Sequence, residues 1–252
     1  MNEIIKELPN TLESIWGSVK NDEQFNNFAL NRVINQQFGD IKSIYDFISE
    51  FDWLTYEIYG EPDKDGFVFP FAVSKVKDGV TEYHGNIGDQ TSSYHKETVA
   101  EHTAIVVANF VGQHICSELL TTIAVLHDVG KKYTSGTNNK GEVCFYGHDT
   151  VSAYLAGRWL YGQFDDEDVK LIVAVIFGHM QPKTAWAQKS EKKDEFEKKL
   201  VSFFDGDENQ AKRAIALIER LSQADEGCRT DEELVAAQEK ICRGELILSA
   251  LG

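Results

Sequence analysis

Apolar residues recur every three or four positions from about residue 98 onward, a spacing typical of helices that bury one face. The predicted helices cover about 98–117, about 118–129, a segment that opens at 148, a segment from about 165 to 179, and about 208–225. The second of these helices stops at Gly130, which we expect to cap its C-terminal end. The pattern therefore predicts a mostly α-helical bundle.

Residues 1–88 follow a different pattern, and we expect them to form a smaller N-terminal α+β portion beside a main domain of residues 89–252. Two amphipathic helical patterns occupy the first 60 residues. A turn cluster, Gly60–Gly66, then precedes Phe67–Val73, which has the composition of a strand. Pro70 within it predicts a sheet edge or an irregular segment.

The length and composition predict a globular protein with one sizeable core. The chain has 252 residues, 42% of them hydrophobic. It contains no apolar run of roughly 18 residues that would span a membrane, and its N-terminus lacks the apolar core of a signal peptide. We therefore expect a cytoplasmic location and no membrane partner. The four cysteines have no Cys-x-x-Cys spacing and are expected to be reduced thiols.

The net charge of −16 argues against an extended nucleic-acid groove, because binding to a phosphate backbone needs clustered Lys and Arg. A local pocket for one phosphate needs only one or two basic residues and a metal. The charge thus favours a small substrate over a long nucleic acid.

Six imidazole and carboxylate groups on successive predicted helices are the candidate metal ligands. Most of them share a helix face with apolar residues, so they are expected to point inward. Nitrogen and oxygen ligands of this kind suit transition metals, which make water a nucleophile at neutral pH. The six residues are His102, His127, Asp128, His148, His179 and Asp225.

Each of these residues also has a structural interpretation. A histidine taken alone is more often a core or surface residue than a ligand. Asp225, directed at an apolar interior, needs either a cation or a salt bridge, for which Arg213, Arg220 and Arg229 are candidates. The joint arrangement, rather than any one residue, favours a metal site.

Four further residues are candidates for substrate binding. Lys131 lies just past a predicted helix end, where it either contacts a phosphate oxygen or neutralises the helix C-terminus. Lys132 and Lys183 are weaker candidates, because exposed lysines are common. His95 lies two turns before His102, either at the pocket mouth or at the surface.

The ordered set resembles the HD superfamily of metal-dependent phosphohydrolases. Within it, Gln90–Gly227 is most similar to the HD region of bacterial tRNA nucleotidyltransferases, through Tyr-His-Lys-Glu-Thr-Val-Ala-Glu-His, Leu-His-Asp-Val-Gly-Lys, Phe-Tyr-Gly-His-Asp and Gly-His-Met. The nucleotide-adding head of that family has no counterpart in residues 1–88, which lack a Gly-Ser turn followed by paired aspartates. Nucleotide addition is therefore not expected.

The resemblance implies a ligand set and a reaction. A first metal would be held by His102, His127, Asp128 and Asp225, and a second by His148 and His179 with Asp128 as the bridge. The resemblance implies one or two divalent ions from among Mn, Fe, Ni, Co and Zn, with Mg also compatible. Asp128 and Lys131 are the expected catalytic residues.

The expected reaction is hydrolysis of a phosphate ester or phosphodiester on a nucleotide, a cyclic nucleotide or an RNA end. Two alternatives stay open. Some relatives with the same six ligands are di-iron oxygenases that act on a small organic substrate. In the second alternative, the chain is a metal-binding interaction module without catalytic activity.

Overall fold

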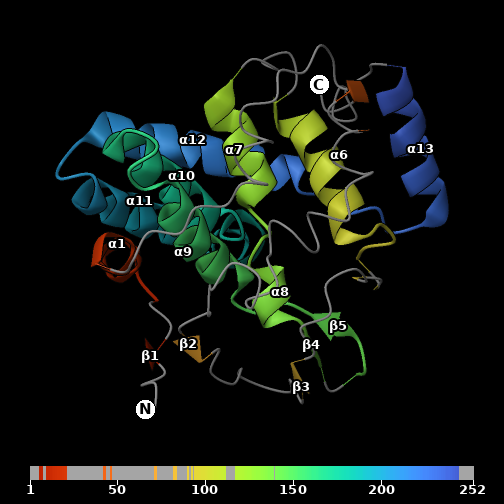
Figure 1. Ribbon diagram of the computed structural model, residues 1–252, viewed down its shortest axis with the longest axis horizontal. Helices are drawn as coiled ribbons and strands as arrows, with labels where there is room; N and C mark the ends of the chain where they lie inside the picture. Colours follow the sequence, from red (N-terminus) through yellow and green to blue (C-terminus); the bar gives the residue numbers. More distant parts are fainter. Residues whose placement is uncertain are drawn as a thin grey trace.

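The computed structural model describes residues 6–7, 10–21, 42–43, 46, 71–72, 82–83, 90, 92, 94–111, 117–138 and 140–243. Most of these residues lie in helices, which confirms the mostly α prediction. Figure 1 shows the helices gathered into one bundle with short strands at its lower edge.

The described ranges contain one helix near the N-terminus and a series of helices from residue 99 onward. They are α1 Leu12–Asn21, α6 Val99–Val111, α7 Glu118–Leu126, α8 Lys131–Thr134, α9 His148–Leu160, α10 Asp166–Gly178, a π-helical turn Pro182–Trp186, α11 Glu191–Phe203, α12 Glu208–Ala224 and α13 Asp231–Cys242.

Within the part of the chain that the structure describes, five two-residue strands form two small sheets. The strands are β1 Lys6–Glu7, β2 Phe71–Ala72, β3 Glu82–Tyr83, β4 Gly136–Thr137 and β5 Val143–Cys144. β1 pairs with β2 in parallel, and β4 pairs antiparallel with both β3 and β5. The short strand β3 from the N-terminal portion thus joins the loop that precedes α9.

Helices α9 and α10 form the centre of the bundle. They pack against each other, and α10 also contacts α7 and α12. The largest side chains buried here are Trp159 and Tyr154 of α9, and they belong to the same apolar core as Ile172 and Val173 of α10. Burial of each such apolar side chain contributes roughly 1.5–3 kcal/mol before conformational entropy is counted.

Helix α1 belongs to the same core, although it comes from the N-terminal portion of the chain. It packs on α9 and α10 with Ile15, Trp16 and Val19 buried. Gly157 of α9 permits this contact, because a Cβ at that position would lie 2.5 Å from Cγ2 of Val19. The second amphipathic pattern and most of Gly60–Val73 lie outside the described residues.

Helix α6 begins with reciprocal hydrogen bonds between its first turn and the residue before it. The Thr98 backbone N–H donates to Oε2 of Glu101 over 2.9 Å, and the Glu101 N–H donates to Oγ1 of Thr98 over 3.2 Å. This capping box sets the start of the helix and leaves His102 on its buried face. The helix ends at Val111, and residues 112–116 of the predicted span lie outside the described ranges.

The prediction that α7 runs to residue 129 and ends on a glycine cap is wrong. The helix ends at Leu126, and Gly130 has right-handed backbone angles, φ −70° and ψ −17°. Its lack of a side chain serves close packing instead, because a Cβ would lie 2.4 Å from the carbonyl oxygen of His148. The Gly130 N–H donates to Oγ of Ser152 over 2.8 Å, which joins this turn to α9.

None of the helices within the described ranges is both long and apolar enough to cross a lipid bilayer.

We expect Gly130→Ala to lower the free energy of unfolding by about 1–3 kcal/mol or more, because the new methyl group meets backbone atoms that cannot rotate away. Gly17→Ala is the control, since no heavy atom lies within 4 Å of its added Cβ in α1. Ala is the better helix former, so this change should raise stability by up to about 1 kcal/mol. Denaturant unfolding measures both, and equal effects would contradict the packing argument.

Candidate metal centre

Five of the six predicted ligands lie at or just beyond the end of a helix. His127 and Asp128 follow α7, His179 follows α10 and Asp225 follows α12, while His148 is the first residue of α9. Only His102 lies inside a helix. All six side chains are buried, and the least buried, His148, is 8% exposed.

Four of the six side chains form a first group, in which one ligand atom from each lies within 4.8 Å of the others. The group consists of His102, His127, Asp128 and Asp225. Nε2 of His102 lies 2.8 Å from Oδ1 of Asp225. Nε2 of His127 lies 3.3 Å from Oδ2 of Asp128 and 3.5 Å from Oδ1 of Asp225.

The second group shares one carboxylate with the first. It contains Asp128, His148 and His179. Nε2 of His148 lies 3.2 Å from Oδ1 of Asp128 and 3.2 Å from Nε2 of His179. Asp128 therefore presents Oδ2 to the first group and Oδ1 to the second, as a bridging carboxylate between two cations would.

Backbone carbonyl groups determine how three of the imidazoles are oriented. Nδ1 of His127, His148 and His179 lies 2.6–2.7 Å from the carbonyl oxygen of the residue three positions earlier. A carbonyl only accepts hydrogen bonds, so each Nδ1 carries a proton and donates it. When such a ring is neutral, it presents the Nε2 lone pair to its group, the tautomer that a metal requires.

The arrangement of these Nε2 atoms fits a cation. Nε2 of His127 is buried and has no hydrogen-bond partner among the described residues. Nε2 of His148 and Nε2 of His179 face each other, although both rings already donate through Nδ1. Buried polar atoms are normally paired, and opposed lone pairs repel. One ion in each group would satisfy these three nitrogens, so the donor set fits the predicted divalent transition metal.

The carboxylates of the centre are ionised. Burial opposes this, but His127 and Lys131 hold the pKa of Asp128 well below its usual range. His102, His127 and Lys183 do the same for the pKa of Asp225. The centre therefore holds two buried carboxylate charges, each of which needs a positive partner.

The histidines respond differently to this negative charge. Burial by itself would lower the pKa of His127, but the carboxylates of Asp128 and Asp225 raise it to about 10. Burial and the neighbouring His148 lower the pKa of His179 to about 4. Without a metal, a proton on His127 thus takes the place of cationic charge in the first group, and metal binding releases it.

Two lysines contact the two carboxylates of the centre. Nζ of Lys131 is buried and lies 2.6 Å from Oδ2 of Asp128, and it donates to Oε1 of Gln90 over 2.9 Å. Nζ of Lys183 lies 2.9 Å from Oδ2 of Asp225 and also donates to the carbonyl oxygen of Asp225. The side chain of Lys132 lies outside the described part of the structure.

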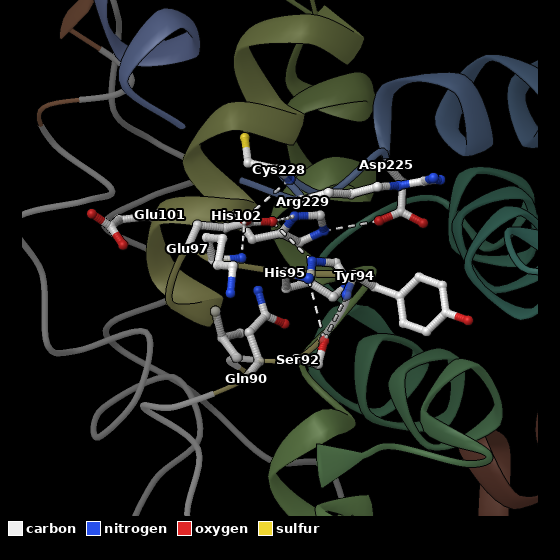
Figure 2. A network of polar contacts seen from close by, with 12 residues as sticks. Gln90, Ser92, Tyr94, His95, Glu97, Glu101, His102, Asp225, Cys228 and Arg229 are labelled. Atoms are coloured by element: carbon white, nitrogen blue, oxygen red, sulfur yellow. Dashed lines mark hydrogen bonds and ion pairs between the residues drawn. The ribbon is translucent and has the colours of Figure 1, made fainter. Parts of the chain in front are cut away.

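The fourth predicted substrate contact, His95, lies beside His102 rather than in either group. Nδ1 of His95 lies 2.8 Å from Oε1 of Glu97, and its ring packs edge-on against the ring of His102 with centroids 4.9 Å apart (Figure 2). The ring is 22% exposed. It therefore reaches the surface next to the centre.

Sequence reasoning missed Glu97 and Gln90, which surround the centre. The fully buried Glu97 accepts from Nδ1 of His102, and Gln90 supports Lys131. The Thr98–Glu101 capping box was the available signal, since it places residue 97 just before α6. Glu97 itself lies outside the helix, so helical spacing does not predict where its side chain points. That direction depends on the segments packed around it.

Comparison with known proteins identifies one related family. The family model described as HD domain matches residues 93–221 of the sequence, just over half of the chain. Five of the six predicted ligands lie inside the match, and Asp225 lies four residues beyond it. No curated protein and no solved structure shows significant similarity to the chain.

We expect a divalent ion such as Mn²⁺ to stabilise the chelator-treated protein by about 2.7 kcal/mol at one hundred times its Kd, because it binds the folded centre. His127→Ala should lose most of this gain. Asp165→Asn should keep it, because this exposed acid precedes α10 and makes no capping hydrogen bond. Thermal unfolding with and without Mn²⁺ measures the gain. An equal gain in His127→Ala would place the ion elsewhere.

Proposed function

Because the chain belongs to the HD domain family, we propose that it is a metal-dependent phosphohydrolase that acts on a nucleotide, a cyclic nucleotide or an RNA end. The family supports metal-dependent hydrolysis, and the two groups of buried ligands support a centre for one or two divalent ions. The substrate class rests on the charges and aromatic residues around that centre.

The proposed roles follow the two groups. The first group holds one ion, and His148, His179 and Asp128 hold a second. Such ions lower the pKa of a coordinated water and neutralise charge on phosphoryl oxygens. The backbone carbonyls behind His127, His148 and His179 keep these rings in place, so the ligands are oriented before an ion arrives.

The pair of lysines at the two carboxylates is the observation that carries the phosphate assignment. Lys131 and Lys183 approach the centre from α8 and from the π-helical turn, and each contacts a different aspartate. When the aspartates bind cations instead, both ammonium groups become available for oxygen atoms of a substrate. Two ammonium groups and divalent ions together favour a phosphorylated anion over a neutral organic substrate.

Exposed tyrosines beside the centre favour a nucleotide. Tyr94, next to His95 in the sequence, is 65% exposed. Tyr146, two residues before His148, is 49% exposed. Figure 2 shows the Tyr94 ring extending away from Glu97. An exposed aromatic face binds a nucleobase by stacking. The resemblance to the HD region of tRNA nucleotidyltransferases adds RNA ends with 2′,3′-cyclic phosphates as substrates to test.

We expect the metal-loaded protein to release phosphate from nucleotides or to open 2′,3′-cyclic phosphates. His127→Ala and Asp128→Ala should each reduce the rate by more than about 100-fold, the upper range for residues that merely orient ligands. Phosphate assays and chromatography of the products measure this. Asp165→Asn is the matched control and should keep the native rate.

The same preparation separates the proposed reaction from the di-iron alternative. Iron-dependent dioxygen uptake without phosphate release would contradict the phosphohydrolase assignment. Hydrolysis that persists undiminished in both variants would place the active site elsewhere.

We further expect Tyr94→Ala to raise KM for a nucleoside monophosphate at least about fivefold, because loss of a stacking partner costs about 1–3 kcal/mol per base. The KM for ribose 5-phosphate, which has no base, should change much less. Val235→Ala removes a similarly exposed apolar side chain from α13 and serves as the control. Equal effects of Tyr94→Ala on both substrates would exclude a stacking role.

A further inference from the structure

Glu97 is a buried carboxylate outside both ligand groups, and it accepts hydrogen bonds from four directions. Oε1 lies 2.8 Å from Nδ1 of His95 and 3.0 Å from Nδ1 of His102. Oε2 accepts the backbone N–H of Lys96 over 3.0 Å and that of Cys228 over 3.1 Å. An ionised carboxylate offers about four acceptor positions, and here all of them are used (Figure 2).

From these contacts we infer that Glu97 is a positioning residue that sets the metal affinity of the first ligand group by orienting His102 and the segment that carries Asp225. This inference rests on the metal binding in the proposed function. It does not depend on which phosphate ester is hydrolysed.

The contact with His102 differs from the contacts of the other three ligand imidazoles. Their Nδ1 atoms donate to backbone carbonyls, whereas Nδ1 of His102 faces a carboxylate. A carboxylate only accepts, so Nδ1 of His102 carries a proton, and the other ring nitrogen, Nε2, faces Asp225 and Asp128, where an ion of the first group would bind it. A charged acceptor also makes Nε2 more basic, which strengthens its bond to a metal.

The second oxygen of Glu97 holds the chain just after Asp225. Cys228, whose N–H it accepts, is three residues beyond that ligand, and the Cys228 carbonyl oxygen accepts the Lys96 N–H over 2.8 Å. Gly227 lets this segment approach, because a Cβ there would lie 2.3 Å from Nδ1 of His95. The Glu97 carboxylate therefore connects two segments that each carry a ligand of the first group. Helix α6 carries His102, and the segment after α12 begins with Asp225.

The second group does not use this connection. His148 and His179 are oriented by the carbonyl groups of Phe145 and Ile176, and no hydrogen bond joins either ring to Glu97 within the described residues. Loss of the Glu97 charge should consequently weaken one ion and spare the other.

We expect Glu97→Gln to weaken the ion of the first group by about 10–100-fold, the range typical of carboxylates that orient ligand histidines. The Gln amide nitrogen donates, so at least one of the four donors around residue 97 loses its acceptor. The affinity for each ion is measured by titrating chelator-treated protein with Mn²⁺. Electron paramagnetic resonance gives the concentration of free Mn²⁺ at each step. His102→Ala and His148→Ala identify which ion belongs to which group.

Glu101→Gln is the matched control. Glu101 lies in the first turn of α6, four residues after Glu97, and accepts from Thr98, and a Gln retains that capping role. This variant should bind Mn²⁺ as the native chain does. If Glu97→Gln also binds both ions with native affinity, Glu97 has no positioning role and the inference is wrong. If the native chain binds no divalent ion, the proposed function itself fails.

A measurement on the native chain decides the question even if Glu97→Gln does not fold. Nitrogen-15 spectra of the Zn²⁺-loaded protein report which ring nitrogen of each histidine carries a proton. We expect His102 to be protonated on Nδ1 with a strongly hydrogen-bonded proton. A His102 ring protonated on Nε2, or one without a hydrogen bond at Nδ1, would overturn the inference.

Discussion

Two aspartates buried among apolar helices impose the constraint on which the rest of this structure depends. A buried charge costs several kcal/mol unless positive charge and hydrogen bonds surround it. Asp128 and Asp225 are surrounded by imidazoles and by one lysine each. The same surroundings that make these charges tolerable also form a site that favours divalent cations over water.

The helical bundle serves this site by placing its ligands at helix ends. A residue at either end of a helix keeps a defined backbone position, while its side chain is free to leave the helix surface. His127, His148 and His179 use this freedom and hydrogen-bond to carbonyl groups three residues earlier. The packed helices α9 and α10 therefore hold His148 and His179 at their ends.

The helical periodicity predicted most of the bundle because burial of one face leaves a regular pattern in the sequence. It could not predict the end of α7, since the role of Gly130 depends on the backbone of α9, which lies far along the chain. The same reason explains why Glu97 was missed. Its partners, His95, His102 and Cys228, meet only after α6 and α12 have packed together.

Residue type and spacing by themselves determined the helical class, the family resemblance and the six candidate ligands, because these depend on local periodicity and on an ordered motif. Tertiary structure decided which atoms face one another. It divided the six residues into two groups that share Asp128, paired Lys183 with Asp225, and brought Glu97 behind His102. Such contacts join segments up to 131 positions apart, and no local pattern records them.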